Sequence, residues 1–221
     1  MRTLFLVRHG QSQSNAGGIT TPHHAIPLTA IGYAQARALA DCLPQQAAAV
    51  LASPYERAQH TAMPYSQKLG LPVQTIDALH ELDAIALERI AGMTGVQRGE
   101  VAATYWAAAD PHLRTGADVE TFAEFAQRVQ AFRVQTLPQL ADGTVLFGHG
   151  MWIEMLFWQV LGFVADDRDG MQGFRAFQQG WPMPNGAVYR LVQAAGSTRW
   201  SIEADLPTMR RMRALAEVEY S

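Results

Sequence analysis

The sequence predicts an α/β fold, a three-layer α/β/α sandwich with a mostly parallel central sheet covered by helices on both faces. Short apolar segments at residues 4–7, 49–52, 72–76 and 144–147 have the length and composition of buried strands. Segments with helical spacing of apolar residues lie between them, and strands that alternate with helices indicate parallel pairing. No internal repeat or low-complexity linker interrupts the chain, so we expect one domain over residues 1–221.

The expected helices have recognisable ends. The first begins after Thr29, whose hydroxyl suits an N-cap, and Pro44 ends it. The second carries Arg57 near its start and stops at Gly70. Further helices are expected over residues 100–109, 121–137 and 152–161, and paired strands over residues 187–192 and 199–203.

Two segments depart from this alternation of strands and helices. Residues 83–96 contain Gly92 and Gly95, which are typical of a loop or lid. Residues 165–185 are rich in Gly, Asp, Gln and Pro, which favours an excursion over the surface. We therefore expect the sandwich to carry a lid or cap formed by loops.

Composition and charge exclude several classes of protein. A net charge of −3 and a pI near 6.1 leave no electrostatic footprint for nucleic acid. Cys42 is the only cysteine, which rules out an intrachain disulfide and a cysteine-based zinc site. The most apolar later run, residues 151–165, is too short to span a bilayer. We therefore expect a soluble, cytoplasmic protein that binds neither nucleic acid nor membrane.

Two of the expected strands deliver a histidine to the same edge of the sheet. The residues that follow them are Arg8, His9 and Gly10 after the first strand, and Gly148, His149 and Gly150 after the fourth. Ligands of open α/β sheets bind beyond the carboxyl ends of the strands, and Gly10 would let the backbone turn sharply and approach a ligand closely. With Arg57 at the start of a helix, these residues predict a concentrated anion site.

Several motifs occur in a characteristic order along the chain. They are Arg8-His9-Gly10 with Asn15, Pro27-Leu28-Thr29, Ser53-Pro54-Tyr55-Glu56-Arg57, Glu120-Thr121, Gly148-His149-Gly150 and Pro184-Asn185-Gly186. This ordered set resembles the histidine phosphatase superfamily, also called the phosphoglycerate mutase-like family, and it spans residues 4–191.

The resemblance implies a phosphoryl-transfer site that uses no metal and no cofactor. A neutral His9 would attack phosphorus and form a phosphohistidine intermediate. Phosphoryl transfer depends mainly on positioning and charge neutralisation, which guanidinium and imidazole groups can supply. The groups that the resemblance assigns to the phosphate of a small phosphorylated substrate, or to inorganic phosphate, are Arg8, Asn15, Arg57, His149 and Gly150.

An alcohol leaving group also needs a proton, which a carboxylic acid can donate and later recover from water. The resemblance places this acid after the third expected strand, where Glu81 is the first candidate and Asp83 the second. Family members often close this region with a glycine soon after the acid, whereas here residues 83–90 come before Gly92. The difference predicts a remodelled lid on the leaving-group side.

Three functions are compatible with these motifs. The first is a phosphatase that hydrolyses small phosphomonoesters through phosphorylated His9. The second is a mutase-type phosphotransferase, but the chain lacks the longer insertion and the Trp-Asn signature that follow the opening motif in the glycolytic mutases. The third is a non-catalytic module that binds a phosphorylated ligand. The sequence does not determine the substrate or the oligomeric state, and a homodimer is one possibility. Adjacent histidines cannot easily share a metal ion, so we expect His23 and His24 in a surface loop at the rim of the pocket.

Overall fold

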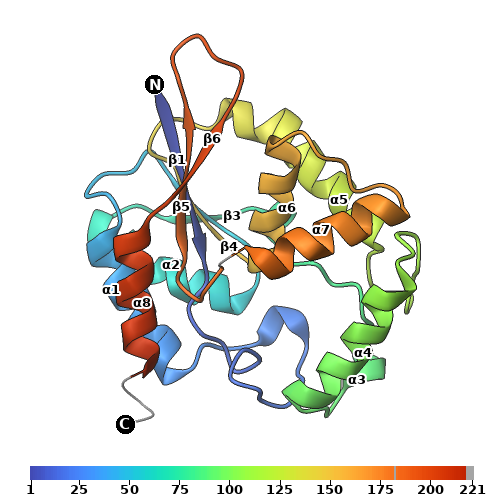
Figure 1. Ribbon diagram of the computed structural model, residues 1–221. Coiled ribbons are helices and arrows are strands. Elements are labelled where there is room, and N and C mark those ends of the chain that lie inside the picture. Colours follow the sequence, from blue (N-terminus) through green and yellow to red (C-terminus); the bar gives the residue numbers. More distant parts are fainter. Residues whose placement is uncertain (182, 218–221) are drawn as a thin grey trace.

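A six-stranded sheet forms the centre of the molecule, and the computed structural model describes residues 1–181 and 183–217 (Figure 1). The strands are β1 (Arg2–Arg8), β2 (Val50–Ala52), β3 (Val73–Thr75), β4 (Val145–Gly148), β5 (Val188–Gln193) and β6 (Ser201–Ala204). They lie in the order β3-β2-β4-β1-β5-β6. Strands β1 to β4 pair in parallel, and β5 and β6 pair antiparallel at one edge. The mostly parallel sheet predicted from the sequence is confirmed.

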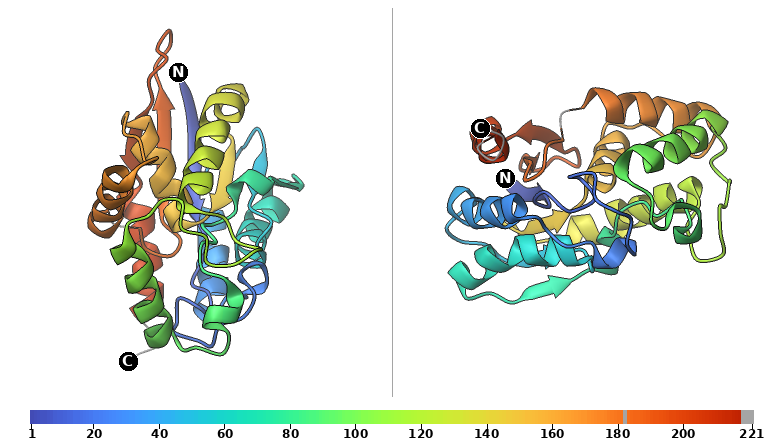
Figure 2. Two further views of the ribbon diagram at one scale, coloured as in Figure 1. Left: turned by 90° about the vertical axis from the view of Figure 1, so that its right-hand side faces the viewer. Right: turned by 90° about the horizontal axis from the view of Figure 1, so that it is seen from below.

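Helices cover both faces of this sheet (Figure 2). Helices α1 (Ala30–Cys42), α2 (Glu56–Leu69) and α8 (Leu206–Glu217) pack on one face, and α5 (Phe122–Ala131) and α6 (Gly150–Val160) pack on the other. Because successive side chains of a strand point to opposite faces, β1 contributes to both cores. Its Leu4 and Leu6 lie in the core with α5 and α6, while Val7 lies in the core with α1, α2 and α8. The three-layer sandwich is therefore confirmed.

The helix ends follow from local side-chain chemistry. The Thr29 hydroxyl accepts a hydrogen bond from the backbone N–H of Gly32 at the start of α1, as expected for an N-cap. Gly70 ends α2 in the left-handed conformation, with φ of 66°. Helix α4 (Gly95–Ala108) begins earlier than the predicted residue 100, because Thr94 and Gln97 form a reciprocal capping box. Short turns of 3-10 helix cover His23–Ala25, Asp77–Leu79 and Leu137–Gln139, and α5 continues into a π-helical segment, Phe132–Thr136.

A cap of helices lies beyond the main sandwich and consists of α3 (Leu87–Ile90), α4 and α7 (Arg168–Gly180). In Figure 1, α3 and α4 (green) lie at the same end of the molecule as the end of β1. None of the helices in residues 1–181 and 183–217 has the length and apolar character needed to cross a membrane.

The expectation of a surface excursion at residues 165–185 is wrong for most of that segment, because α7 occupies it and buries Met171 and Phe174. Its glycines permit close packing. A Cβ atom on Gly170 would lie 2.8 Å from the carbonyl oxygen of Val164, and one on Gly173 would lie 3.1 Å from the ring of Trp158. The glycine content that is typical of a loop therefore serves here to bring a helix against its neighbours.

Candidate active site

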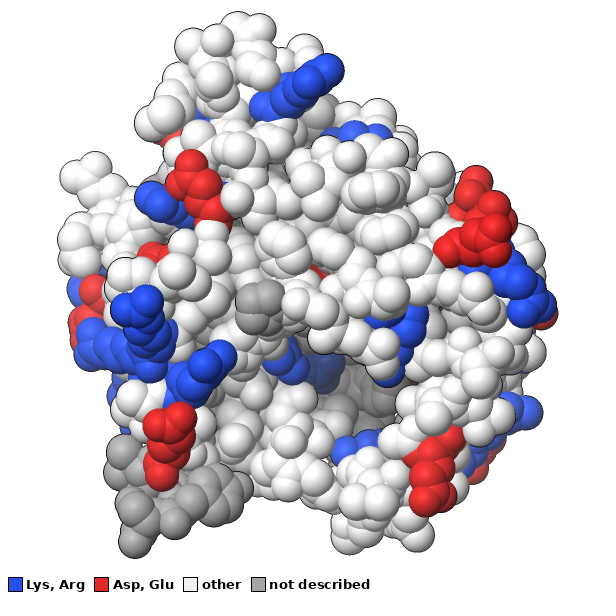
Figure 3. Space-filling model, viewed as in Figure 1, with Lys and Arg blue, Asp and Glu red and all other residues white. Residues whose placement is uncertain are grey.

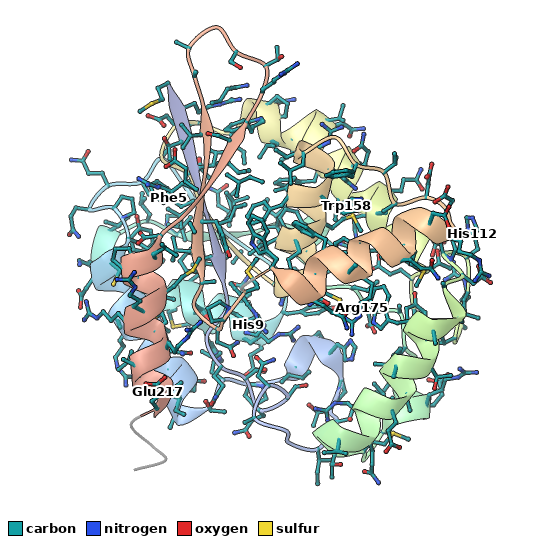
Figure 4. The ribbon with its side chains drawn as sticks, viewed as in Figure 1. Phe5, His9, His112, Trp158, Arg175 and Glu217 are labelled. Carbon is teal, nitrogen blue, oxygen red and sulfur yellow. The ribbon has the colours of Figure 1, made fainter. Side chains whose placement is uncertain are left out.

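The register of β1 and β4 brings the two motif histidines together. Arg8 lies opposite Gly148 in the parallel pair, so His9 and His149 are the next residues on the two chains. The backbone N–H of His9 donates to the carbonyl oxygen of Gly148 at 3.0 Å, and the two imidazole centroids are 5.2 Å apart. The two histidines therefore share one site at the carboxyl ends of the strands (Figure 4 labels His9).

Gly10 is needed for a contact within the protein. A Cβ atom at this position would lie 2.6 Å from the backbone carbonyl oxygen of Gly32 in α1, and one on Gly32 would lie 2.0 Å from the carbonyl oxygen of Gln11. The sequence argument attributed the need for glycine at position 10 to the close approach of a ligand. In the structure, helix α1 is the neighbour that makes a glycine necessary there. The N–H of Gly10 also donates to the Thr61 hydroxyl at 3.0 Å, which fixes the motif against α2.

His9 is held as a neutral imidazole with its Nε2 lone pair available. Its Nδ1 lies 2.7 Å from the carbonyl oxygen of Gly10, which can only accept, so Nδ1 carries the proton. Nε2 accepts a hydrogen bond from Nε of Arg57 at 3.1 Å. Burial, followed by the charges of Arg57 and Arg8, holds the pKa of His9 well below its usual value. At neutral pH the ring is therefore uncharged and nucleophilic.

Two arginines bring positive charge to this histidine. Arg57, at the start of α2, also donates to the backbone carbonyl oxygen of His23 at 2.6 Å. Burial lowers the pKa of Arg57 to about 10, so it stays cationic at neutral pH. Arg8 donates to the carbonyl oxygen of Met183, while its Nε is buried with no partner among the described residues. A buried guanidinium N–H without an acceptor is unfavourable, and an anion would satisfy it.

His149 and Gly150 begin α6 beside this pair. His149 is fully buried, and its Nε2 lies 2.8 Å from the hydroxyl oxygen of Ser53. Its Nδ1 has no partner within the described chain. Burial, followed by the charge of Arg57, holds the pKa of His149 well below its usual value. Gly150 packs against Arg8, because a Cβ there would lie 3.4 Å from Arg8 Nε.

Glu81 and Asp83, the two candidate acids, occupy different places. Both oxygens of Glu81 accept backbone N–H groups, from Leu82 at 3.0 Å and, at the start of α6, from Met151 at 3.1 Å and Trp152 at 3.0 Å. Glu81 therefore lies in the cleft that also contains His9. An Asp83 carboxylate oxygen lies 2.9 Å from Nδ1 of His23, and Asp83 lines a different cavity. Of the two candidate acids, only Glu81 lines the cleft with His9, which favours Glu81 over Asp83.

The Glu120 motif supports the segment that carries Glu81. Both carboxylate oxygens of Glu120 accept from Arg128, at 2.6 Å and 3.1 Å. The same guanidinium donates to the carbonyl oxygens of Ala78 and His80, both at 2.9 Å. A bidentate arginine–carboxylate pair is geometrically specific. This pair therefore fixes the chain immediately before Glu81.

Asn15 and Asn185 connect the opening motif to the strand near the end of the chain. The Asn15 carbonyl oxygen accepts from the Ser12 hydroxyl at 3.0 Å and from Nδ2 of Asn185 at 2.8 Å. Asn185 Nδ2 also lies within 3.3 Å of the carbonyl oxygen of His9. With its oxygen occupied, Asn15 has only its amide N–H groups to offer to a ligand.

Glu154 is a site residue that the sequence argument missed. It lies on α6, is only 1% exposed, and has one carboxylate oxygen without a partner among the described residues. Burial, followed by the charge of Glu81, raises its pKa to about 8, whereas Arg8 opposes this shift. The available signal was a lone carboxylate in the most apolar run of the sequence, five residues after His149.

These groups surround one cleft with a volume of about 380 Å³. Figure 3 shows it as a hollow in this face with basic side chains at its rim. Of the residues predicted from the sequence, Arg8, His9, Asn15, Arg57, Glu81 and Gly150 line the cleft, and His149 lies directly beside His9. His23 also lines it, which agrees with a place at the rim. Among the described residues, no group of three or more His, Cys, Asp or Glu side chains could hold a metal ion.

Comparisons with known proteins agree with the family that the sequence motifs resemble. The sequence profile of the histidine phosphatase superfamily (branch 1) matches residues 4–200. The adenosylcobalamin/alpha-ribazole phosphatase of Escherichia coli (strain K12) is 31% identical over 180 residues, which cover 80% of this chain and 87% of that protein. A probable phosphoglycerate mutase, GpmB, of Enterobacter sp. (strain 638) is 30% identical over 170 residues, which cover 75% of this chain and 77% of that protein. Among solved structures, the mycobacterial glucosyl-3-phosphoglycerate phosphatase Rv2419c superposes with a TM-score of 0.69 at 24% identity, over 92% of this chain and 97% of that one.

Proposed function

This chain belongs to the histidine phosphatase superfamily, branch 1, and we propose that it hydrolyses small phosphomonoesters through a phosphohistidine formed on His9. The observation that carries the proposal is the state of His9. Its Nδ1 proton is donated to the Gly10 carbonyl oxygen, and its Nε2 lone pair faces Arg57 at 3.1 Å in the cleft. A neutral imidazole between two fixed guanidinium groups is arranged to attack a phosphoryl group.

In the first step, His9 Nε2 attacks phosphorus in line with the bond to the alcohol oxygen. The N–P bond forms, the P–O bond breaks, and Glu81 donates the proton that the departing alkoxide needs. Arg57 Nε exchanges its bond to His9 for one to a phosphoryl oxygen, because the lone pair that it occupies is the one that attacks. Arg8 Nε and His149 Nδ1, both buried without partners in the described chain, donate to the other phosphoryl oxygens. Asn15 and Gly150 complete the phosphate site as further donors.

In the second step, water attacks the phosphohistidine. Glu81, now ionised, accepts a proton from that water, and inorganic phosphate leaves as the N–P bond breaks. No metal takes part in either step, because the two guanidinium groups supply the positive charge. A cytoplasmic location, as expected from the sequence, stays a prediction.

The charge distribution of the cleft favours hydrolysis over a mutase reaction. A mutase must hold a second phosphate group near the acceptor hydroxyl. Among the residues that line the cleft, the arginines are Arg8 and Arg57, while the leaving-group side carries Glu81 and Glu154. A second phosphate would therefore face carboxyl groups instead of cations.

The test is rapid acid quenching of the protein with a generic phosphomonoester in the presence of a metal chelator, followed by mass analysis. We expect an adduct with the mass of one phosphoryl group that maps to His9 and decays with release of phosphate. The His9→Ala variant should form no adduct. His112→Ala is the matched control, because His112 is exposed and lies far from His9 (Figure 4).

Three results would contradict the proposal. Labelling of the His9→Ala variant would remove His9 as the nucleophile. An adduct that is discharged only by an added alcohol would show a phosphotransferase, and binding of phosphate without any adduct or turnover would leave a binding module.

A further inference from the structure

A second cavity adjoins the phosphate cleft on the side of Glu81. This side cavity has a volume of about 210 Å³ and shares His23, Leu82 and Met151 with the cleft. The other residues that form it include Ile85 and, from the cap, Ile90, Ala102, Tyr105 and Trp106. The two cavities are thus neighbours, with one at the strand ends and the other under α3 and α4.

The lining of the side cavity is mostly apolar. Of its polar side chains, Arg98 and His23 are already engaged, whereas the Tyr105 hydroxyl has no hydrogen-bond partner among the described residues. The Arg98 guanidinium donates to the carbonyl oxygens of Gly18 at 2.6 Å and Met93 at 3.1 Å, and to Ser14 at 3.2 Å. The His23 ring is paired with Asp83 at 2.9 Å. A sugar or carboxylate placed here would find only the Tyr105 hydroxyl free, so most of its hydrogen bonds to water would be lost without replacement, which is unfavourable. The cavity therefore suits carbon-rich groups.

Glu81 lies where the two cavities meet. Leu82 is the next residue, and the backbone N–H of Met151 donates to Glu81 Oε2 at 3.1 Å. Both of these residues line both cavities. An alcohol oxygen that receives a proton from Glu81 is therefore close to the side cavity, and the carbon atoms attached to that oxygen are within reach of it.

We propose that the side cavity binds the alcohol half of the substrate, and that the preferred substrates are phosphomonoesters of an alcohol with an aromatic or similarly bulky apolar group. This inference rests on the proposed phosphatase function. The size agrees with one ring and a short linker, since an apolar cavity of about 150 Å³ in another protein binds benzene. The aromatic side chains of Trp106 and Tyr105 line the cavity, and aromatic groups pair favourably with one another.

The test compares kcat/KM for ethyl phosphate and 2-phenylethyl phosphate. The leaving groups of the two esters are primary alkoxides of similar basicity. A difference in kcat/KM between them therefore reports binding of the ring and not a difference in intrinsic reactivity. We expect the phenylethyl ester to be preferred about tenfold or more, because apolar pockets discriminate by at least this factor for small apolar groups. Equal kcat/KM values for the two esters would overturn the inference.

A matched pair of variants on α4 locates the effect. Ala102→Phe places a ring in the side cavity and should lower kcat/KM for the phenylethyl ester about tenfold more than for the ethyl ester. Ala103→Phe, on the exposed side of the same helix, should leave the preference unchanged. A preference that survives in Ala102→Phe would place the ring elsewhere and overturn the inference.

The outcomes separate this inference from the function on which it rests. Release of phosphate from both esters without a preference contradicts the side cavity alone. Absence of both phosphate release and a His9 adduct contradicts the phosphatase itself. The comparison in the unmodified protein decides the matter even where Ala102→Phe does not fold.

Discussion

The two ends of the cleft are built in different ways. At the phosphate end, Arg8, His9 and His149 come from the ends of adjacent strands, and Arg57 comes from the first turn of a helix. At the leaving-group end, Glu81 lies in an irregular segment, Glu154 projects from within α6, and the side cavity is covered by the cap helices α3 and α4.

Under the proposed function, the phosphate end suits the chemistry of phosphoryl transfer, and the leaving-group end suits selection of the alcohol. Strand ends in a parallel sheet are held by ladder hydrogen bonds and by both cores, so they can place charged groups accurately in every substrate complex. Segments that connect the regular elements tolerate change, so they are suited to distinguish one alcohol from another. Changes at the two ends should therefore have different dependence on the leaving group.

The largest effect is expected at the phosphate end. Arg57→Lys keeps the charge but loses the planar set of donors that joins His9, the His23 carbonyl oxygen and the phosphoryl group. We expect kcat/KM to fall by about 10² to 10³, the range seen when one transition-state donor is removed. The loss should be similar for ethyl phosphate and p-nitrophenyl phosphate, measured by phosphate release. Arg37→Lys, at an exposed position of α1, is the control, and a loss confined to one ester would contradict the assignment.

A smaller effect, selective for the leaving group, is expected at the other end. Glu81→Gln removes the proton donor, so hydrolysis of ethyl phosphate should slow by about 10². Hydrolysis of p-nitrophenyl phosphate, whose leaving group needs no proton, should slow by less than about tenfold on the same reasoning. The matched variant Asp83→Asn should show no such selectivity, because Asp83 is paired with His23 outside the cleft. Equal losses for both esters would assign Glu81 a structural role.

The smallest effect concerns stability and its dependence on pH. The folded protein raises the pKa of Glu154 from 4.5 to about 8, so between these values it retains a proton that the unfolded chain releases. The folded state then binds more protons than the unfolded state, and this group makes the free energy of unfolding fall as pH rises through that window.

Glu154→Gln removes this dependence. The free energy of unfolding of the variant, measured by denaturant unfolding relative to the unmodified protein, should therefore rise between pH 5 and pH 8, with a slope of at most about 1.4 kcal/mol per pH unit. Glu100→Gln, at an exposed position of α4, serves as the control and should show a flat difference. A difference for Glu154→Gln that stays constant or shrinks over this range would contradict a buried, neutral Glu154.

Local sequence patterns were sufficient to predict the sandwich and to predict that His9 and His149 lie together at one edge of the sheet. Strand segments, helix caps such as Thr29 and stops such as Gly70 depend on neighbours within a few residues, so they can be read from the chain. The residues that follow two buried strands reach the same edge in any parallel sheet, which is why His9 and His149 could be expected together.

The leaving-group end depends on contacts between segments that are far apart in the sequence. The local periodicity of apolar residues does not reveal such contacts. Helix α7 looked like a loop because of its glycines, and only its packing against Val164 and Trp158 explains them. The state of Glu154 follows from burial near Glu81 and Arg8, and the side cavity exists only because α4 lies over the segment that follows Glu81. Burial and cavities are properties of assembled surfaces, so this end of the site becomes visible only once the chain has folded.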